Sequence, residues 1–231
     1  MILITGHKGF IGTRLTERLA DFGIVGIDIR EGMNLISCSL PNDFDVEVVY
    51  HLAAQSDVAA SWKDPVHDMD NIRMTARLVK RYPHTKIIYA NSAATLPPIS
   101  SPYGFSKWAS AEYLKTFHND YIVCTFPNIY GEGSRSVVDI FKKLDSVTIY
   151  GDGLQTRDYV HVDDIVEGLV KAKDWPKGEY QMGSGKSTTV LELAKGKVIH
   201  HEPGRKEARE CIMRNDTPDW KPKINVHDYL S

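Results

Sequence analysis

Short apolar runs alternate, over the first half of the chain, with segments in which apolar residues recur every three or four positions. The runs are typical of strands buried on both faces of a sheet, and they lie at residues 1–5, 24–28, 46–52, 86–90 and 121–126. The periodic segments predict helices with one apolar face, at residues 13–22, 70–82 and 103–118. Strands that alternate with helices predict right-handed β–α–β units and a parallel sheet.

The pattern becomes less regular after about residue 126. Further strands are expected at 147–150 and 180–183 and a helix at 163–173, and the tail shows no long periodic element. We therefore predict an α/β fold, a doubly wound parallel sheet with a small C-terminal lobe for a substrate. The sheet domain is expected to comprise residues 1–128, with 154–183 returning to it, and the lobe residues 129–153 and 184–231.

The composition is that of an ordinary soluble globular protein. Of the 231 residues, 42% are hydrophobic and 25% are charged, and the net charge of −2 favours neither nucleic acid nor an anionic membrane as a partner. No apolar run approaches the roughly 20 residues of a membrane span. Cys38, Cys124 and Cys211 are odd in number and far apart, so we expect reduced thiols in a cytoplasmic protein. His200 and His201 have no companion ligands, so no metal is expected.

A glycine-rich turn joins the first predicted strand to the first predicted helix. In the sequence Gly6-His-Lys-Gly9-Phe-Ile-Gly12, every third residue is a glycine. Backbone N–H groups at the start of a helix attract a pyrophosphate, and glycines let the phosphates come close. The order of strand, turn and helix therefore favours a Rossmann-type dinucleotide site, with a tight turn that binds nothing as the alternative.

The second predicted strand ends in an acidic residue, Asp28. At this position, about 20 residues beyond the loop, a carboxylate can accept hydrogen bonds from the adenosine ribose, which favours NAD over NADP. Its neighbour Ile29 is assigned to the same site. Lys8 and Arg30 could instead meet a 2′-phosphate, so NADP stays an alternative.

Tyr103 and Lys107 lie one turn apart on a predicted helix, and Ser92 follows the strand before it. Because residues at i and i+4 share a helix face, the Lys107 ammonium could favour the phenolate of Tyr103, whose ordinary pKa is about 10. In an open α/β sheet the carboxyl ends of the strands face the ligand, which puts Ser92 beside a nicotinamide. These three residues are the predicted acid–base centre.

The chain resembles the extended short-chain dehydrogenase/reductase family, and within it the NAD-dependent nucleotide-sugar epimerases and dehydratases, of which the UDP-glucose 4-epimerases are the nearest in pattern. Each match is modest alone, and the ordered set is specific. The matching segments are GHKGFIG (6–12), Asp28, HLAAQ (51–55), Asn71, NSAA (91–94), SPYGFSK (101–107), PNIYGEG (127–133), IYGDGLQTRDYVHVDD (149–164), YQMGSGKST (180–188) and WKPK (220–223).

The resemblance implies a role for each matched residue. Tyr103 is the acid–base residue, Lys107 holds the nicotinamide ribose, and Ser92 bonds the reacting hydroxyl. The residues that it implies around NAD are Gly6, Gly9, Phe10, Ile11, Gly12, Asp28, Ile29, Leu52, Ala53, Ala54, Tyr103, Lys107, Phe126 and Pro127. The residues that it implies around a nucleotide-diphosphate sugar are Ser92, Asn128, Tyr150, Arg157 and Arg205. The helices at 70–82 and 103–118 match those of the family's dimer, so a homodimer is expected.

Three of the substrate residues have structural alternatives. Arg157 offers a charged fork suited to phosphate, and it could instead pair with Asp158. Asn128 could cap a turn, and Tyr150 could be a core residue. A further segment, 183–188, resembles a nucleotide P-loop, but Tyr180 stands where that motif needs a glycine, so a loop that leaves the last sheet strand is the preferred interpretation.

The residues after Ser92 indicate the reaction. The 4,6-dehydratases that the chain resembles carry an Asp-Glu pair there, whereas this chain has Ala93 and Ala94, whose side chains cannot exchange a proton. We therefore predict an NAD-dependent nucleotide-sugar epimerase that inverts C4 through a 4-keto intermediate with Tyr103 as acid and base. The alternatives are a reductase, dehydrogenase or dehydratase of the same family and a non-catalytic NAD-binding relative. The chain is shorter than is usual for the family, mainly on the substrate side.

Overall fold

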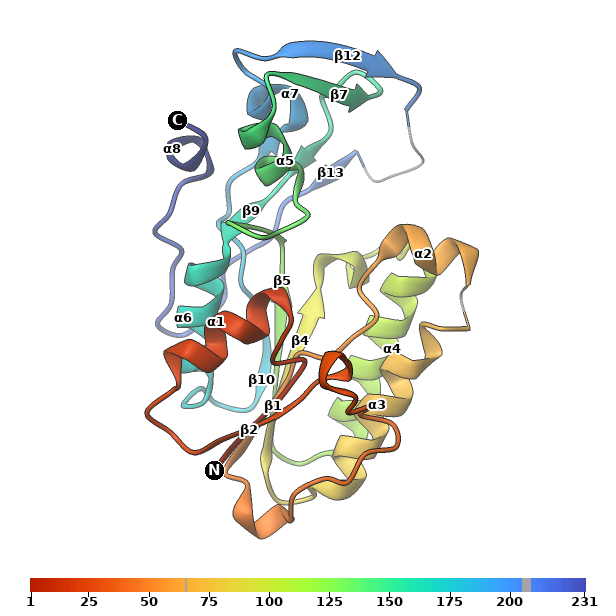
Figure 1. Cartoon of the computed structure of the whole chain (residues 1–231), viewed down its shortest axis with the longest axis vertical. Helices are drawn as coiled ribbons and strands as arrows, with labels where there is room; N and C mark the ends of the chain where they lie inside the picture. Colours follow the sequence, from red (N-terminus) through yellow and green to blue (C-terminus); the bar gives the residue numbers. More distant parts are fainter. Residues whose placement is uncertain (65, 205–208) are drawn as a thin grey trace. The chain divides into compact units, whose positions relative to one another are not determined.

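The computed structural model describes residues 1–64, 66–204 and 209–231 (Figure 1). The chain forms two compact units, and each is described by itself. The first unit comprises Met1–Thr125 and Leu169–Tyr180, and the second comprises Phe126–Gly168 and Gln181–Ser231. The division expected from the sequence, residues 1–128 with 154–183 against residues 129–153 with 184–231, stays a prediction.

A six-stranded sheet forms the framework of the first unit, in the order β10-β5-β4-β3-β1-β2. Strand β1 pairs in parallel with both β2 and β3, and β3 pairs in parallel with β4. The predicted α/β fold with a Rossmann-type parallel sheet is thereby confirmed. The strands are β1 (Ile2–Thr5), β2 (Ile24–Ile27), β3 (Val48–His51), β4 (Lys86–Ser92), β5 (Tyr121–Phe126) and β10 (Gly178–Gln181).

Strands β1 and β3 of this sheet are buried along their whole length, which explains their unbroken apolar sequences. Every residue of β1 and β3 is buried. Leu3, Val49 and Ile87 of the sheet form one core with Leu78 and Leu114 of the covering helices. The helices of this unit are α1 (Phe10–Arg18), α2 (Val58–Lys63), α3 (Met69–Arg81) and α4 (Pro102–Phe117), with 3-10 turns at Ile29–Glu31, Asp43–Asp45 and Ala93–Thr95.

Helix α1 lies earlier in the sequence than its apolar spacing predicted. It begins at Phe10, inside the glycine loop, and ends at Arg18, so the predicted extension to Phe22 is wrong. Phe22 is 54% exposed instead of lying on the buried face with Leu15. Helix α4 begins as its sequence predicts, because Ser101 caps it by accepting from the Gly104 N–H and Pro102 occupies its first turn.

The second unit consists of short elements around a core of its own. Tyr130, Val138, Phe141 and Ile149 pack together there with Val226 near the C-terminus. Strand β7 pairs with β12, β8 lies between β11 and β13, and β6 pairs with β9. The elements are β6 (Asn128–Tyr130), α5 (Val137–Lys143), β7 (Ser146–Tyr150), β8 (Thr156–Arg157), β9 (Tyr159–His161), α6 (Val162–Ala172, which runs on into the first unit), β11 (Thr188–Thr189), α7 (Val190–Leu193), β12 (Val198–Glu202), β13 (Glu210–Cys211) and α8 (Val226–Leu230).

The segment that resembles a P-loop binds a carboxylate of the chain itself. The backbone N–H groups of Ser184 and Gly185 donate to Asp158, whose side chain is fully buried, and the Ser184 hydroxyl donates to it at 2.6 Å. The amide groups that a phosphate would need are therefore bonded within the chain. Among the described helices, none combines the length and the apolar character needed to cross a bilayer.

Candidate active site

The glycine loop of the first unit has the tight geometry that a dinucleotide site requires. Gly6 has φ +73°, and a Cβ on it would come within 2.7 Å of the Ala53 nitrogen. A Cβ on Gly12 would come within 2.1 Å of the Gly6 carbonyl oxygen. Only glycine fits at these two positions, and the loop folds closely against the segment after β3.

The same loop presents the start of α1 as an anion site. Gly9 is the N-cap residue of α1 and has no side chain that could cap it. The first-turn N–H groups, those of Phe10, Ile11 and Gly12, precede the first intrahelical hydrogen bond, which Thr13 donates to Gly9 at 3.0 Å. These unpaired donors and the positive end of the helix suit a pyrophosphate, so the residues fit a dinucleotide.

Asp28 is held at the end of β2 by backbone groups of its neighbours. Its carboxylate accepts from the backbone N–H of Lys8 and from that of Arg30, each at 2.9 Å, and the residue is 7% exposed. The Lys8 ammonium pairs with Glu31 at 3.1 Å, and the Arg30 guanidinium donates to the Lys8 carbonyl. Both cations that could have met a 2′-phosphate therefore have partners within this loop.

The segment after β3 lies against the glycine loop, and the expected role of Leu52, Ala53 and Ala54 in lining the cofactor stays a prediction. The Leu52 N–H donates to the carbonyl of Thr5 at 3.1 Å, and the Ala53 N–H donates to its hydroxyl at 3.2 Å. Phe126 is 4% exposed and, with Pro127, opens the second unit, where each is buried. Their expected contact with the cofactor stays a prediction.

Ser92 and Tyr103 are brought together in the first unit. Ser92 ends β4 and lies close enough to Tyr103 to lower the pKa of its phenol by hydrogen bonding; Tyr103 lies in the first turn of α4 and is 9% exposed. Gly104 makes the approach possible, because a Cβ on it would come within 2.4 Å of the Ala94 carbonyl oxygen. Helix α4 can therefore press its first turn against the segment after Ser92.

Lys107 is buried one turn further along α4. Its Nζ donates to the Ala90 carbonyl at 2.6 Å and lies 4.1 Å from the ring centre of Tyr89. Burial lowers the pKa of Lys107 to about 7, and burial also raises the pKa of Tyr103, which the hydrogen bond from Ser92 lowers and the charge of Asp68 raises. The lowering of the Tyr103 pKa by Lys107 stays a prediction.

Two residues of this region have roles that the sequence did not reveal. Asn71 donates to the Ser106 hydroxyl at 3.0 Å and accepts from the Gln55 N–H at 2.8 Å, so it ties the segment after β3 to α4. Asp68 is 3% exposed and acts electrostatically on Tyr103. No sequence signal separates Asp68 from its exposed neighbour Asp64, since both lie in the same polar segment.

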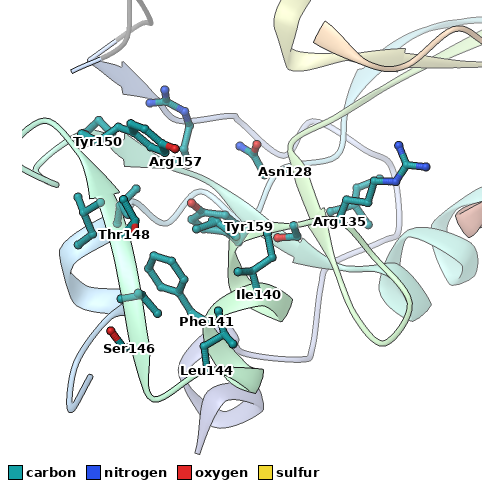
Figure 2. A pocket seen from close by; sticks show the side chains of 17 residues that line it. Asn128, Arg135, Ile140, Phe141, Leu144, Ser146, Thr148, Tyr150, Arg157 and Tyr159 are labelled. Carbon is teal, nitrogen blue, oxygen red and sulfur yellow. Dashed lines mark hydrogen bonds between the residues drawn. The ribbon is translucent and has the colours of Figure 1, made fainter. Parts of the chain in front are cut away.

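The second unit contains a cavity of about 680 Å³ that gathers three predicted substrate residues, Asn128, Tyr150 and Arg157. Figure 2 shows these polar side chains along one side of the cavity and the apolar Ile140 and Phe141 along the other. The volume is in the range of small-molecule sites. Arg135 also lines the cavity and was missed, because it lies in a stretch without a recognisable motif. Arg205, a further predicted substrate residue, lies outside the described residues.

The exposure and hydrogen bonds of Tyr150, Arg157 and Asn128 bear on their structural alternatives. Tyr150 is 38% exposed, so it is not a core residue. The Arg157 guanidinium donates to the Thr156 carbonyl at 2.7 Å, while the Asp158 carboxylate is held by the loop after β10. The Asn128 amide nitrogen donates to the Asp158 carbonyl at 3.3 Å, and the residue also lines the cavity.

Comparisons with known proteins show which family this chain resembles. The model of the NAD dependent epimerase/dehydratase family matches residues 2–183. The chain is 33% identical to a UDP-glucose 4-epimerase of Mycolicibacterium smegmatis, over 99% of this chain and 96% of that protein. It is 26% identical to a UDP-glucuronate 4-epimerase of Thermodesulfobacterium geofontis, over 99% and 93% of the two chains.

A solved structure gives the same result for the fold. The UDP-glucose 4-epimerase of Thermotoga maritima, solved with UDP-glucose, superimposes with a TM-score of 0.84 at 26% identity, over 99% of this chain and 96% of that chain. The alignment with the M. smegmatis enzyme extends over 299 positions, whereas this chain has 231 residues, so the relative carries segments that this chain lacks. The expected family and its cofactor NAD are thereby confirmed, and the chain belongs to the NAD-dependent epimerase/dehydratase family.

Proposed function

We propose that this chain is a nucleotide-sugar epimerase that uses NAD to invert the C4 carbon of a hexose. The observation that carries the proposal is the approach of Ser92, at the end of β4, to Tyr103, in a unit whose glycine loop fits a dinucleotide. Relatives named as 4-epimerases of UDP-glucose and UDP-glucuronate support the reaction type.

Most of the residues assigned to the cofactor lie in the first unit. The N–H groups at the start of α1 hold the pyrophosphate, Asp28 accepts from the adenosine ribose, and Lys107 holds the nicotinamide ribose. These residues would hold NAD, which would supply the acceptor and later the donor of the sugar's hydride. The pairing of Lys8 with Glu31 places a negative charge where a 2′-phosphate would come, which supports NAD over NADP.

Proton transfer is assigned to Tyr103. Its phenolate takes the proton of the C4 hydroxyl as the hydride leaves, and Ser92 holds that hydroxyl by a hydrogen bond. After the 4-keto sugar has rotated in the site, so that its opposite face meets the cofactor, the phenol of Tyr103 returns the proton to the C4 oxygen. The buried ammonium of Lys107 favours the phenolate, because in a low dielectric a nearby positive charge acts strongly.

Ala93 and Ala94 support epimerisation over dehydration. They form the 3-10 turn directly after Ser92, and the Ala94 N–H donates to the Ser92 hydroxyl at 3.2 Å. Elimination of water needs a further acid and base beside the sugar, and alanine side chains provide neither. The same observation disfavours the dehydratase alternative. A reductase or dehydrogenase would differ from an epimerase in a net oxidation or reduction of the cofactor.

Binding of the nucleotide is assigned to the cavity of the second unit. Arg157 and Arg135 provide charge for the diphosphate, Asn128 provides a hydrogen bond, and the exposed ring of Tyr150 stacks on the base. Arg205 keeps its proposed role as a second phosphate-binding arginine.

A homodimer and a cytoplasmic location complete the proposal. Helices α3 and α4 pack side by side, and they expose Met69, Phe105, Trp108 and Phe117, each more than 40% accessible. Exposed apolar residues gathered on a helix pair favour a protein interface. All three cysteines are free thiols, which supports a reducing compartment.

The test is to incubate the purified chain with NAD and UDP-glucose, UDP-galactose or UDP-glucuronate and to follow the sugar by NMR. Appearance of the C4 epimer without net NADH formation is the expected result. Stoichiometric NADH would instead favour the dehydrogenase alternative, and a product that has lost water would favour a dehydratase. Absence of hydride exchange with any sugar nucleotide would leave the non-catalytic alternative.

A further inference from the structure

Asp68 is a buried carboxylate without a hydrogen-bond partner for one of its oxygens. It lies directly before α3 and is 3% exposed, and its Oδ2 atom contacts no donor among the described residues. Burial of a charged or polar group without a partner is costly, so such groups are rare in native proteins unless a ligand completes them. The proton state and charge of Asp68 are therefore not explained by the fold alone.

The surroundings of Asp68 connect it to the acid–base centre. Its charge raises the pKa of Tyr103, so it lies within electrostatic reach of the phenol. The charges that act on Asp68 itself are those of His67 and Asp64, both exposed, and it forms no ion pair with a described lysine or arginine. Asp68 thus offers a buried hydrogen-bond acceptor whose charge acts on the residue that handles the reacting hydroxyl.

We infer that Asp68 accepts a hydrogen bond from a hydroxyl of the substrate's sugar, and that it thereby selects a neutral hexose over a hexuronate. The inference rests on the proposed function, because it takes the sugar to lie at Ser92 and Tyr103. A hexose presents several hydroxyl donors around the ring, and one of them satisfies Oδ2. The carboxylate of a hexuronate brings a second negative charge into a buried region that has no ion-pairing cation for Asp68.

The size of the selection follows from the two effects. A hydrogen bond to a charged acceptor changes affinity by roughly 10- to 100-fold, and like-charge repulsion in a desolvated site adds to it. Selectivity of this kind arises both from weaker binding of the rejected ligand and from tighter binding of the favoured one. We expect the wild-type chain to bind UDP-glucose at least about tenfold more tightly than UDP-glucuronate.

Calorimetric titration of the NAD-loaded full chain with UDP-glucose and with UDP-glucuronate tests the inference. The wild-type protein, Asp68→Asn and the control Asp70→Asn are compared. Asp70 lies two residues further along and pairs with Arg73 at 2.9 Å, so its variant removes a nearby charge outside the site. We expect the preference for UDP-glucose to fall about tenfold or more in Asp68→Asn and to be unchanged in Asp70→Asn.

Two results would overturn the inference. One is a wild-type chain that binds UDP-glucuronate as tightly as UDP-glucose, a measurement that needs no variant. The other is an Asp68→Asn protein that loses affinity for both ligands equally, which would mark Asp68 as structural. Epimer formation, followed by NMR on the same samples, separates the two proposals. A preserved preference without any epimer contradicts the proposed reaction alone, and epimer formation with no effect of Asp68→Asn contradicts the Asp68 inference alone.

Discussion

The two units of the chain hold their functional side chains in opposite ways. In the first unit Asp28, Tyr103 and Lys107 are each less than 10% exposed and fixed by close contacts. In the second unit Asn128, Arg135 and Tyr150 are exposed on short elements around an open cavity. Chemistry that depends on the placement of a proton requires rigid support, whereas recognition of a nucleotide tolerates adaptable side chains. Substitutions should therefore act steeply in the first unit and gradually in the second.

Tyr103→Phe is expected to have the largest effect. It removes the acid–base group and leaves the ring in place, so the epimerisation rate should fall by roughly 10²- to 10⁴-fold. Tyr113→Phe, in the same helix but packed against Phe117, is the matched control and should stay near wild-type activity. Rates are measured by coupled assay, and circular dichroism checks folding. A Tyr103→Phe enzyme that keeps most of its activity would contradict the assigned mechanism.

Gly12→Ala should come next, because the new Cβ would lie 2.1 Å from the Gly6 carbonyl oxygen. The loop must shift, and we expect NAD affinity to fall at least about tenfold, with a lower melting temperature. Gly23→Ala is the control, since the nearest atom to its Cβ would be 3.9 Å away. Fluorescence titration with NADH and thermal unfolding measure both effects. Equal behaviour of the two variants would show that the loop is not tightly constrained.

Arg157→Lys should give a moderate effect in the second unit. Lysine keeps the charge but loses the planar fork, so the KM for the nucleotide sugar should rise about tenfold while kcat changes less. Arg209→Lys, at an exposed arginine bonded to Asp152, is the control and should be neutral. If kcat falls as steeply as in Tyr103→Phe, the contrast between the two units is wrong.

The smallest effect concerns stability at low pH. Burial lowers the pKa of His51 to about 3, because the ring is enclosed between Thr5 and Thr75. Since the unfolded chain binds a proton near pH 6.5 and the folded chain does not, stability should fall as pH decreases from 6.5 towards 3, by up to about 1.4 kcal/mol per pH unit. Denaturant titrations at several pH values measure this slope. His51→Gln should lose the part of the slope that this proton causes.

The same contrast explains what could be predicted from the sequence. Strands buried on both faces need unbroken apolar runs, and α3 and α4 need one regular apolar face. The sequence pattern therefore predicts these elements. Helix α1 was misplaced because Gly9 and Gly12 interrupt its apolar spacing, while Phe22 beyond its end suggested a longer one. In the second unit, α5 has seven residues and β12 is largely exposed, so neither leaves a periodic signal.

The candidate site follows the same division. Ser92, Tyr103 and the glycine loop lie in motifs whose order along the chain identifies them. Arg135 and Asp68 were not predicted, because one lies in a shortened segment without a motif and the other depends on burial that no local pattern encodes. Burial of a single charged side chain is a property of the tertiary structure, and the sequence around Asp68 is that of a polar surface turn.

The loop around Asp158 also bears on how this chain could be misjudged. Gly183–Thr188 reads like an ATP-binding motif, yet its amide groups already enclose an anion that is covalently part of the same polypeptide. Such a tethered occupant competes at a high effective concentration, so free nucleoside triphosphates would have to displace it to enter. The loop consequently stabilises the contact between the residue after β8 and the chain beyond β10. Millimolar ATP should leave the conformation of the loop unchanged.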